Sequence, residues 1–193
     1  MKTDIILAGV GGQGILSIAA AIGLAAVKNN LYIKQAEVHG MSQRGGDVQS
    51  HLRISDKPIA SDLIPMGKAD LILSIEPMEA LRYLPFLSKS GWLVTNITPF
   101  NNIPDYPNLE DILKQINSLP NHIAIDSDAI AKEAGSSRSS NIVMLGAASL
   151  FIDIPYEKLE DGIRELFGRK GESIVNTNLK ALHAGREYSQ KNK

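Results

Sequence analysis

The chain contains no cysteine among its 193 residues. This absence excludes disulfide bonds and thiol nucleophiles. It also excludes any iron–sulfur cluster held by this chain alone, because such clusters are held by cysteine thiolates. If electrons pass through an assembly that contains this protein, another chain carries them.

The chain also lacks an excess of charge and a long apolar run. Its 20 Lys and Arg residues and 21 Asp and Glu residues give a net charge of -1, so no overall field attracts nucleic acid or an anionic membrane. No window reaches the roughly 20 apolar residues of a membrane span. Gly9, Gly11, Gly12 and Gly14 interrupt the apolar amino-terminal stretch, which argues against a secretory signal. We therefore predict a cytoplasmic protein with no nucleic-acid or membrane partner.

The composition is that of an ordinary globular protein, with 44% hydrophobic and 21% charged residues. A chain of this length fits a single domain, 1–193, and shows no internal repeat or long linker. Short apolar segments alternate with longer helical patterns, which is typical of a largely parallel sheet covered on both faces. We predict an α/β fold, a three-layer Rossmann-like sandwich with a helical carboxyl-terminal part.

The expected elements follow from apolar runs and their periodicity. Residues 48–55 alternate between apolar and polar side chains, which predicts a strand paired antiparallel at an edge of the sheet. Residues 37–47 are a loop by composition, Asn141 is expected to cap a helix, and 189–193 are expected to be a frayed tail. The other strands are expected at 5–8, 31–36, 69–75, 91–95 and 122–125, and the helices at 15–27, 77–87, 109–119, 127–134, 142–151, 156–167 and 173–188.

A glycine-rich turn is expected between the first strand and the first helix. Gly9, Gly11 and Gly14 match the pattern G-x-G-x-x-G, with Gly12 and Gln13 completing the turn. Free N–H groups at the start of the helix would face a bound anion. Glu37 lies 23 residues after Gly14, close to where dinucleotide-binding domains place the acid that holds a ribose. These features leave three interpretations open: NAD or FAD binding, a Rossmann-like turn without nucleotide, and a site for another anion.

A second segment, from Glu37 to Gly46, is dense in functional side chains. It follows the second strand, so we expect it beside the glycine turn, in the crevice where open sheets bind ligands. The alternative is a solvated connection whose polar groups cap one another. The candidate site residues of this segment are Glu37, His39, Gly40, Met41, Ser42, Gln43, Arg44, Gly45 and Gly46.

Several other sites are excluded by spacing. Arg44 stands where a hydrolase elbow needs glycine, and Asp62 stands where a phosphate-binding P-loop needs glycine. The four histidines, at 39, 51, 122 and 183, are too scattered to predict a metal site. Glu76 and Glu79 are expected on an exposed helix face or as a cap, and not as an acid/base pair.

Two segments together resemble a known family. The run GVGGQG at 9–14 and the run EVHGMSQRGGDVQSHLRIS at 37–55 are similar to the gamma-type domain of the 2-oxoacid:ferredoxin oxidoreductases, and most similar to its indolepyruvate-type members. The similarity runs over most of the chain and includes SNIVMLGAASLF at 140–151. The first run alone would fit many dinucleotide-binding proteins, so the pairing of the two runs carries the resemblance.

The resemblance implies a subunit of an enzyme that oxidatively decarboxylates aryl 2-oxoacids such as indolepyruvate, forms the acyl-CoA and passes electrons to ferredoxin. The family uses thiamine diphosphate and iron–sulfur clusters, which the large alpha subunit would hold, and CoA is the co-substrate. The small chain would be inactive alone, and no catalytic residue is assigned to it. The segment from Glu37 to Gly46 would lie at the partner interface, where Arg44 and His39 would meet a carboxylate or phosphates.

Two other functions stay open at this point. One is a self-sufficient enzyme that binds NAD(P) or FAD in the glycine turn, and the other is a ligand-sensing module that uses the same crevice. The isolated chain is also expected to form a homodimer if the apolar surface meant for a partner pairs with itself. The second segment favours the subunit interpretation over both alternatives.

Overall fold

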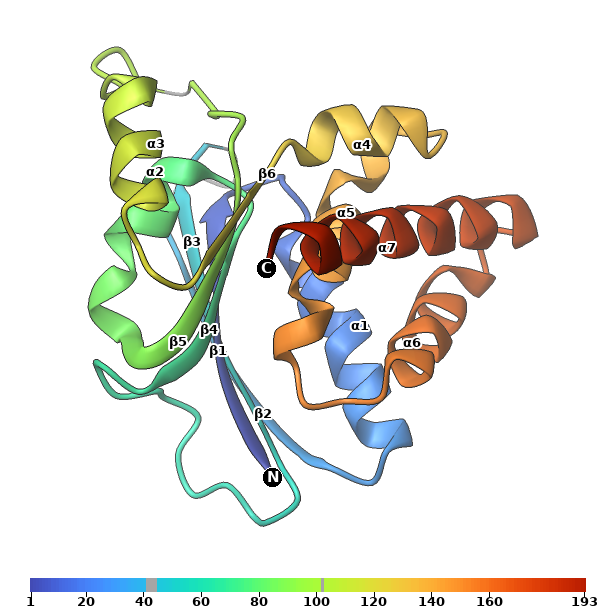
Figure 1. The fold of residues 1–193 in the computed structure, drawn as a ribbon. Helices are drawn as coiled ribbons and strands as arrows, with labels where there is room; N and C mark the ends of the chain where they lie inside the picture. The colour runs from blue at the N-terminus through green and yellow to red at the C-terminus, as the bar shows by residue number, and fades with distance from the viewer. Residues whose placement is uncertain (41–44, 102) are drawn as a thin grey trace.

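The computed structural model describes residues 1–40, 45–101 and 103–193. A six-stranded sheet in the order β2-β3-β1-β4-β5-β6 forms the middle layer. Helices α2 and α3 cover one face, and α1, α5, α6 and α7 lie on the other (Figure 1). The strands are β1 Lys2–Val10, β2 Tyr32–His39, β3 Asp47–Ser55, β4 Ala69–Ser74, β5 Leu87–Asn96 and β6 His122–Ile125. The α-helices are α1 Ile15–Lys28, α2 Pro77–Arg82, α3 Leu109–Asn117, α4 Ser127–Glu133, α5 Ser140–Ala148, α6 Tyr156–Gly168 and α7 Glu172–Asn192.

The central strand β1 supplies apolar side chains to both layers. Ile5 and Leu7 belong to the hydrophobic core beneath α1 and α5, whereas Ile6 and Ala8 belong to the core beneath α2 and α3. Successive side chains of a strand point to opposite faces, so a strand covered on both sides needs a continuous apolar run. The three-layer sandwich predicted from such runs is confirmed.

The strand predicted at 48–55 is present and antiparallel, but it does not lie at the edge of the sheet. β3 pairs antiparallel with both β1 and β2, so that β2 becomes the edge strand. The polar side chains His51 and Arg53 of this strand form hydrogen bonds within the protein. His51 Nδ1 accepts a hydrogen bond from the Ile64 N–H at 2.9 Å, and Arg53 pairs with the buried Asp4 at 2.8 Å.

Three further local expectations are wrong. Glu37 and His39 belong to β2 and not to a loop, because pairing with β3 extends the strand to His39. Residues 189–193 are not a frayed tail, since α7 continues to Asn192 and the Tyr188 hydroxyl donates to the Ala124 carbonyl at 2.8 Å. Asn141 lies inside α5, whose N-cap is Ser139. In each case a tertiary contact extends or shifts the element.

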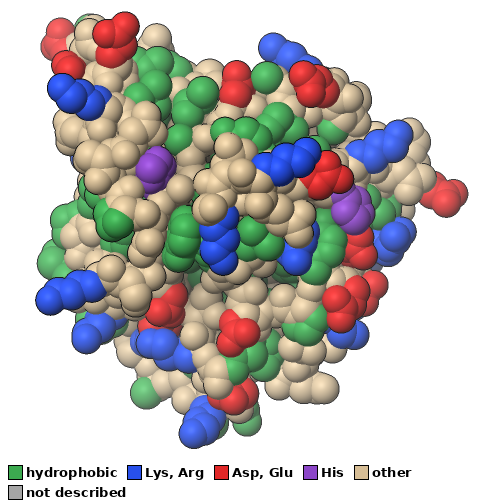
Figure 2. Space-filling view, viewed as in Figure 1, with side chains coloured by type: hydrophobic (Ala, Val, Ile, Leu, Met, Phe, Trp, Pro, Cys, Tyr) green, Lys and Arg blue, Asp and Glu red, His purple; other side chains and the backbone are tan. Residues whose placement is uncertain are grey.

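Basic and acidic side chains of the described residues are interspersed on the face drawn in Figure 2. This distribution agrees with the small net charge of -1 and shows no single-sign patch on that face that would attract nucleic acid. Among the described residues, no helix is both long and apolar enough to cross a membrane.

Two glycines set the distance between α5 and α7. A Cβ atom at Gly185 would overlap the carbonyl oxygen of Val143, and a Cβ atom at Gly146 would overlap the carbonyl oxygen of Leu182. The two backbones therefore touch where the helices cross. This contact holds α7 against α5, the helix that also packs against the glycine turn.

We expect Gly185→Ala to lower the free energy of unfolding by about 1–3 kcal/mol, because the added methyl group forces two packed backbones apart. Urea denaturation of the purified chain measures the effect as a lower transition midpoint. Gly168→Ala, near the end of α6, is the matched control, since a Cβ atom there meets nothing within 4 Å. The control is expected to be neutral or to stabilise by up to about 1 kcal/mol. Equal midpoints for the two variants would contradict the close crossing.

Candidate functional site

The glycine turn joins β1 to α1 at the carboxyl end of the central strand. Gly12 and Gly14 have φ angles of 102° and 85°, a region in which side chains other than glycine are strained. A Cβ atom at Gly14 would lie 2.6 Å from Nδ2 of Asn141, and this Nδ2 donates to the Gly14 carbonyl at 3.2 Å. The third glycine therefore lets α5 approach the turn.

Gln13 stabilises the glycine turn through hydrogen bonds to its backbone. Its Oε1 accepts a hydrogen bond from the Val10 N–H at 2.8 Å, and its own N–H donates to the Val10 carbonyl at 3.1 Å. A longer bond of 3.5 Å joins its Nε2 to the Ile75 carbonyl. These bonds hold the backbone of the turn, and Gln13 also lines a groove beside it, so its place among the ligand-facing residues stays a prediction.

The second predicted segment lies against the glycine turn. The Gly11 N–H donates to the Gly46 carbonyl at 2.8 Å, and the Gly45 N–H donates to the Gly11 carbonyl at 3.4 Å. Gly40 closes the loop at its other end through a bond of 3.1 Å from its N–H to the Asp47 carbonyl. The predicted residues Met41, Ser42, Gln43 and Arg44 lie outside the described residues. The remaining members of both segments come together at one end of the sheet.

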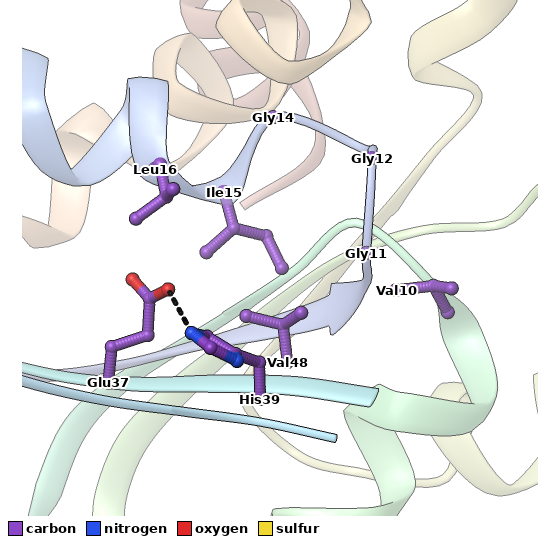
Figure 3. A pocket seen from close by; sticks show the side chains of 9 residues that line it. All are labelled: Val10, Gly11, Gly12, Gly14, Ile15, Leu16, Glu37, His39 and Val48. Carbon is purple, nitrogen blue, oxygen red and sulfur yellow. Dashed lines mark ion pairs between the residues drawn. The ribbon is translucent and has the colours of Figure 1, made fainter. Parts of the chain in front are cut away.

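A crevice of about 490 Å³ opens between the glycine turn and β2. Glu37 and His39 line it from alternate positions of β2, while Ile15 and Leu16 form an apolar wall on the α1 side (Figure 3). His39 Nε2 lies 3.9 Å from Oε1 of Glu37. The His39 side chain is 67% exposed and the Glu37 side chain 19% exposed. The crevice thus offers a polar pair opposite an apolar wall, beside the N–H groups of a glycine turn.

A network of buried acids supports this end of the sheet. Glu76 caps α2, because its Oε2 accepts from the Glu79 N–H at 2.8 Å, and Glu79 pairs with Arg82 at 2.8 Å. Burial raises the pKa of Glu79, against the opposing effect of Arg82. The Tyr83 hydroxyl donates to Oδ2 of Asp47 at 3.3 Å, and burial next to that carboxylate raises the pKa of Tyr83 to about 12.

The expected cap role of Glu76 is therefore confirmed, but the alternative of an exposed face is wrong, since both glutamates are buried. Sequence reasoning missed the contact of Asn141 with the turn. The only available signal was a polar residue ahead of an apolar helix, which a cap explains equally well. Among the described residues, no group of His, Asp and Glu is arranged to hold a metal ion.

Comparison with known proteins identifies the family. Residues 4–188 match the family described as pyruvate ferredoxin/flavodoxin oxidoreductase. The chain is 39% identical to indolepyruvate oxidoreductase subunit IorB of Archaeoglobus fulgidus, with 98% of this chain and 96% of that protein covered. The chain therefore belongs to this family, and the predicted resemblance and the expectation of an oxidoreductase subunit are confirmed.

Solved structures show the same fold. The gamma subunit of a keto/oxoacid ferredoxin oxidoreductase from Geobacter sulfurreducens superposes with a TM-score of 0.72 at 24% identity, with 98% of this chain and 99% of that chain covered. A 2-oxoglutarate:ferredoxin oxidoreductase from Magnetococcus marinus gives a TM-score of 0.77 at 23% identity, with 98% of this chain and 31% of that chain covered. The relative from Archaeoglobus fulgidus and the neighbour from Geobacter sulfurreducens are both named as subunits of oxidoreductases.

We expect Gly14→Ala to destabilise the protein more than Gly12→Ala does. Both substitutions place a side chain at positive φ, which costs about 1–2 kcal/mol. Only Gly14→Ala also meets Asn141, because a Cβ atom at Gly12 meets nothing within 4 Å. Thermal unfolding of the two single variants measures the difference. Adding Asn141→Ala is expected to recover part of the loss in Gly14→Ala and none in Gly12→Ala; the same recovery in both would exclude the direct contact.

Proposed function

We propose that this chain, as one gamma-type domain, is the small subunit of an enzyme that oxidises indolepyruvate. The reaction would be oxidative decarboxylation of an aryl 2-oxoacid to its acyl-CoA, with electrons passed to ferredoxin. One observation carries the proposal. The hydrogen bond from the Gly11 N–H to the Gly46 carbonyl joins the two segments that resemble the family, 9–14 and 37–46, beside the crevice. The name of the relative from Archaeoglobus fulgidus supports the choice of substrate.

The redox groups of such a reaction are assigned to a larger partner subunit. Iron–sulfur clusters need thiolate ligands, and the chain has no cysteine. Bound thiamine diphosphate supplies stabilisation of the carbanion formed on decarboxylation, and the described residues offer no metal-ligating cluster for its diphosphate. The chain therefore lacks the thiolates that clusters need, and its described residues lack a metal-ligating group for thiamine diphosphate, so we assign both groups to the partner subunit. The structure of the related enzyme from Magnetococcus marinus has coenzyme A bound, and this supports CoA as co-substrate.

The role of this chain would be to complete a site that the partner begins. His39 projects from β2 with most of its side chain exposed, so it is free to meet an anionic group of the substrate or of CoA. Glu37 lies next to it and would orient the imidazole. Leu16 is 59% exposed at the rim of the same crevice. An exposed leucine beside a polar crevice fits a surface that a partner subunit covers.

A stand-alone dinucleotide-binding function is the second candidate. The observation that favours it is the place of Glu37, which lines the same crevice as Gly11, Gly12 and Gly14. A ribose held by Glu37 would put its phosphates at the turn. This candidate predicts a nucleotide bound by the isolated chain, whereas the subunit proposal predicts activity only in a complex.

Reconstitution tests the proposed function. The chain is co-expressed with a candidate large subunit that carries thiamine diphosphate and cysteine-cluster motifs, and indolepyruvate-dependent reduction of ferredoxin is measured. We expect activity when both chains are present and none with either chain alone. Failure to form a complex, together with NAD(P) or FAD retained by the isolated chain, would favour the stand-alone function.

In the reconstituted enzyme, His39→Gln is expected to lower kcat/KM by about tenfold or more, the usual effect of losing one polar contact to a charged group. The exposed position of His39 predicts unchanged folding of the isolated chain. His183→Gln is the matched control, because His183 is also half-exposed but pairs with Glu160, on the outer helix layer. Equal activity of the His39 variant and the wild type would remove His39 from the site.

Leu16→Gln is expected to weaken association with the large subunit by about tenfold, since burying a leucine side chain is worth about 1.5–3 kcal/mol. Val27→Gln provides the control, because Val27 is 61% exposed near the other end of α1. Titration of each variant against the immobilised large subunit measures the dissociation constants. A larger effect at Val27 than at Leu16 would move the partner surface away from the crevice.

A further inference from the structure

A second and larger groove lies on the opposite side of the glycine turn. It has a volume of about 760 Å³, within the range of small-molecule sites. Gly12 and Gly14 form the wall that it shares with the crevice described above. The rest of its lining comes from Gln13 and Ser17, from the segment 135–141, from the end of α6 with Lys170, and from the start of α7. None of the described residues of the Glu37 to Gly46 segment lines this groove.

The lining of the groove is cationic and rich in hydroxyl groups. Arg138 and Lys170 contribute two positive charges, and no Asp or Glu is among the described residues that line the groove. Neither cation forms an ion pair with a carboxylate in the part of the chain that the structure describes. The hydroxyl groups of Ser136, Ser173 and Thr177 lie along the same walls. Unpaired cations together with hydroxyl donors are the side chains that recognise phosphate oxygens.

Ser139 provides an independent sign of a ligand. It is only 3% exposed and it lines the groove. It occupies the N-cap position of α5, yet its hydroxyl does not cap the helix. Among the described residues, the hydroxyl groups that are fully buried without a partner are those of Ser127 and Ser189, so the Ser139 hydroxyl stays open to the groove. A hydroxyl that caps no helix and opens into the groove is available to donate to an anion that enters it.

Two helices also begin at this groove. Gly14 precedes α1, Gly171 precedes α7, and neither helix has a side-chain cap. Ser17 and Ser173, from the first turns of these helices, line the groove. The uncapped N–H groups of both helices add to the positive potential that Arg138 and Lys170 create.

We propose that the groove between the glycine turn and the segment 135–141 binds the phosphate or diphosphate group of a small ligand. Arg138 and Lys170 neutralise its charge, and the Ser139 hydroxyl donates to one of its oxygens. The proposal goes beyond the proposed function, because it concerns binding by this chain alone and needs no partner subunit. Inorganic diphosphate, a nucleoside diphosphate and CoA all carry the required group.

Titration calorimetry of the full chain with inorganic pyrophosphate tests the proposal, with ADP and CoA as separate arms. We expect pyrophosphate to bind and to compete with whichever organic ligand binds more tightly. Tighter binding of CoA than of ADP would identify CoA as the source of the phosphate, and the reverse would identify a nucleotide. No heat from any of the three ligands up to millimolar concentration overturns the proposal.

Variants assign the binding to this groove. Arg138→Gln and Lys170→Gln are each expected to weaken pyrophosphate binding by about fivefold or more, and to reduce its dependence on salt concentration. Arg169→Gln is the matched control, because Arg169 is an exposed neighbour of Lys170 that does not line the groove. Equal weakening by all three variants would show general charge attraction and would overturn the site.

Ser139→Ala separates binding from folding. Because the Ser139 hydroxyl does not cap α5, removing it is expected to leave the thermal midpoint unchanged and to weaken pyrophosphate binding by about threefold or more. A lower midpoint with unchanged binding would give Ser139 a structural role only and would contradict the proposal. These measurements use the isolated chain, so a failure of the reconstituted electron transfer does not affect their outcome.

Discussion

Close approach of other segments to the backbone of the glycine turn is the constraint on which the rest of this structure depends. The turn is approached on one side by Asn141 of α5 and on the other by Gly45 and Gly46 of the second segment. A side chain at Gly14 would block the first approach. Both contacts are made to peptide groups of the turn itself. The turn therefore fixes the position of the crevice on the β2 side relative to the groove on the α5 side.

The two sides of the turn differ in chemistry. On the β2 side, Glu37 and His39 face an apolar wall in an open crevice, next to the exposed Leu16. On the α5 and α7 side, cations and hydroxyl groups line a larger groove without an acid among its described residues. A surface with exposed apolar residues is suited to a partner subunit, whereas a cationic groove is suited to a small anion. One glycine turn therefore separates a surface for assembly from a groove for a charged group.

Short apolar runs predicted five of the strands and the sandwich, because a parallel sheet covered on both faces requires them, and alternation predicted the sixth strand at 48–55. The position of the antiparallel strand was wrong for a physical reason. The alternation in 48–55 predicts a strand at an edge of the sheet, but Asp4 and the Ile64 N–H satisfy the polar side chains Arg53 and His51 within the protein. Partners that are distant in sequence are not visible in a periodic pattern.

The sequence by itself determined the glycine turn and the adjacency of the second segment, since these follow from local residue types and from the order of strands and helices. The resemblance of these two segments to known proteins indicated the family. Only the tertiary structure decided how the polar residues are used. Gln13 binds inside the turn, Glu76 is buried as a cap, and Asn141 contacts the turn and caps no helix. The serine-rich groove likewise exists only because α1, α5 and α7 meet there. Local propensity sets where an element forms, while the partner of a polar atom depends on segments that folding brings together over long distances along the chain.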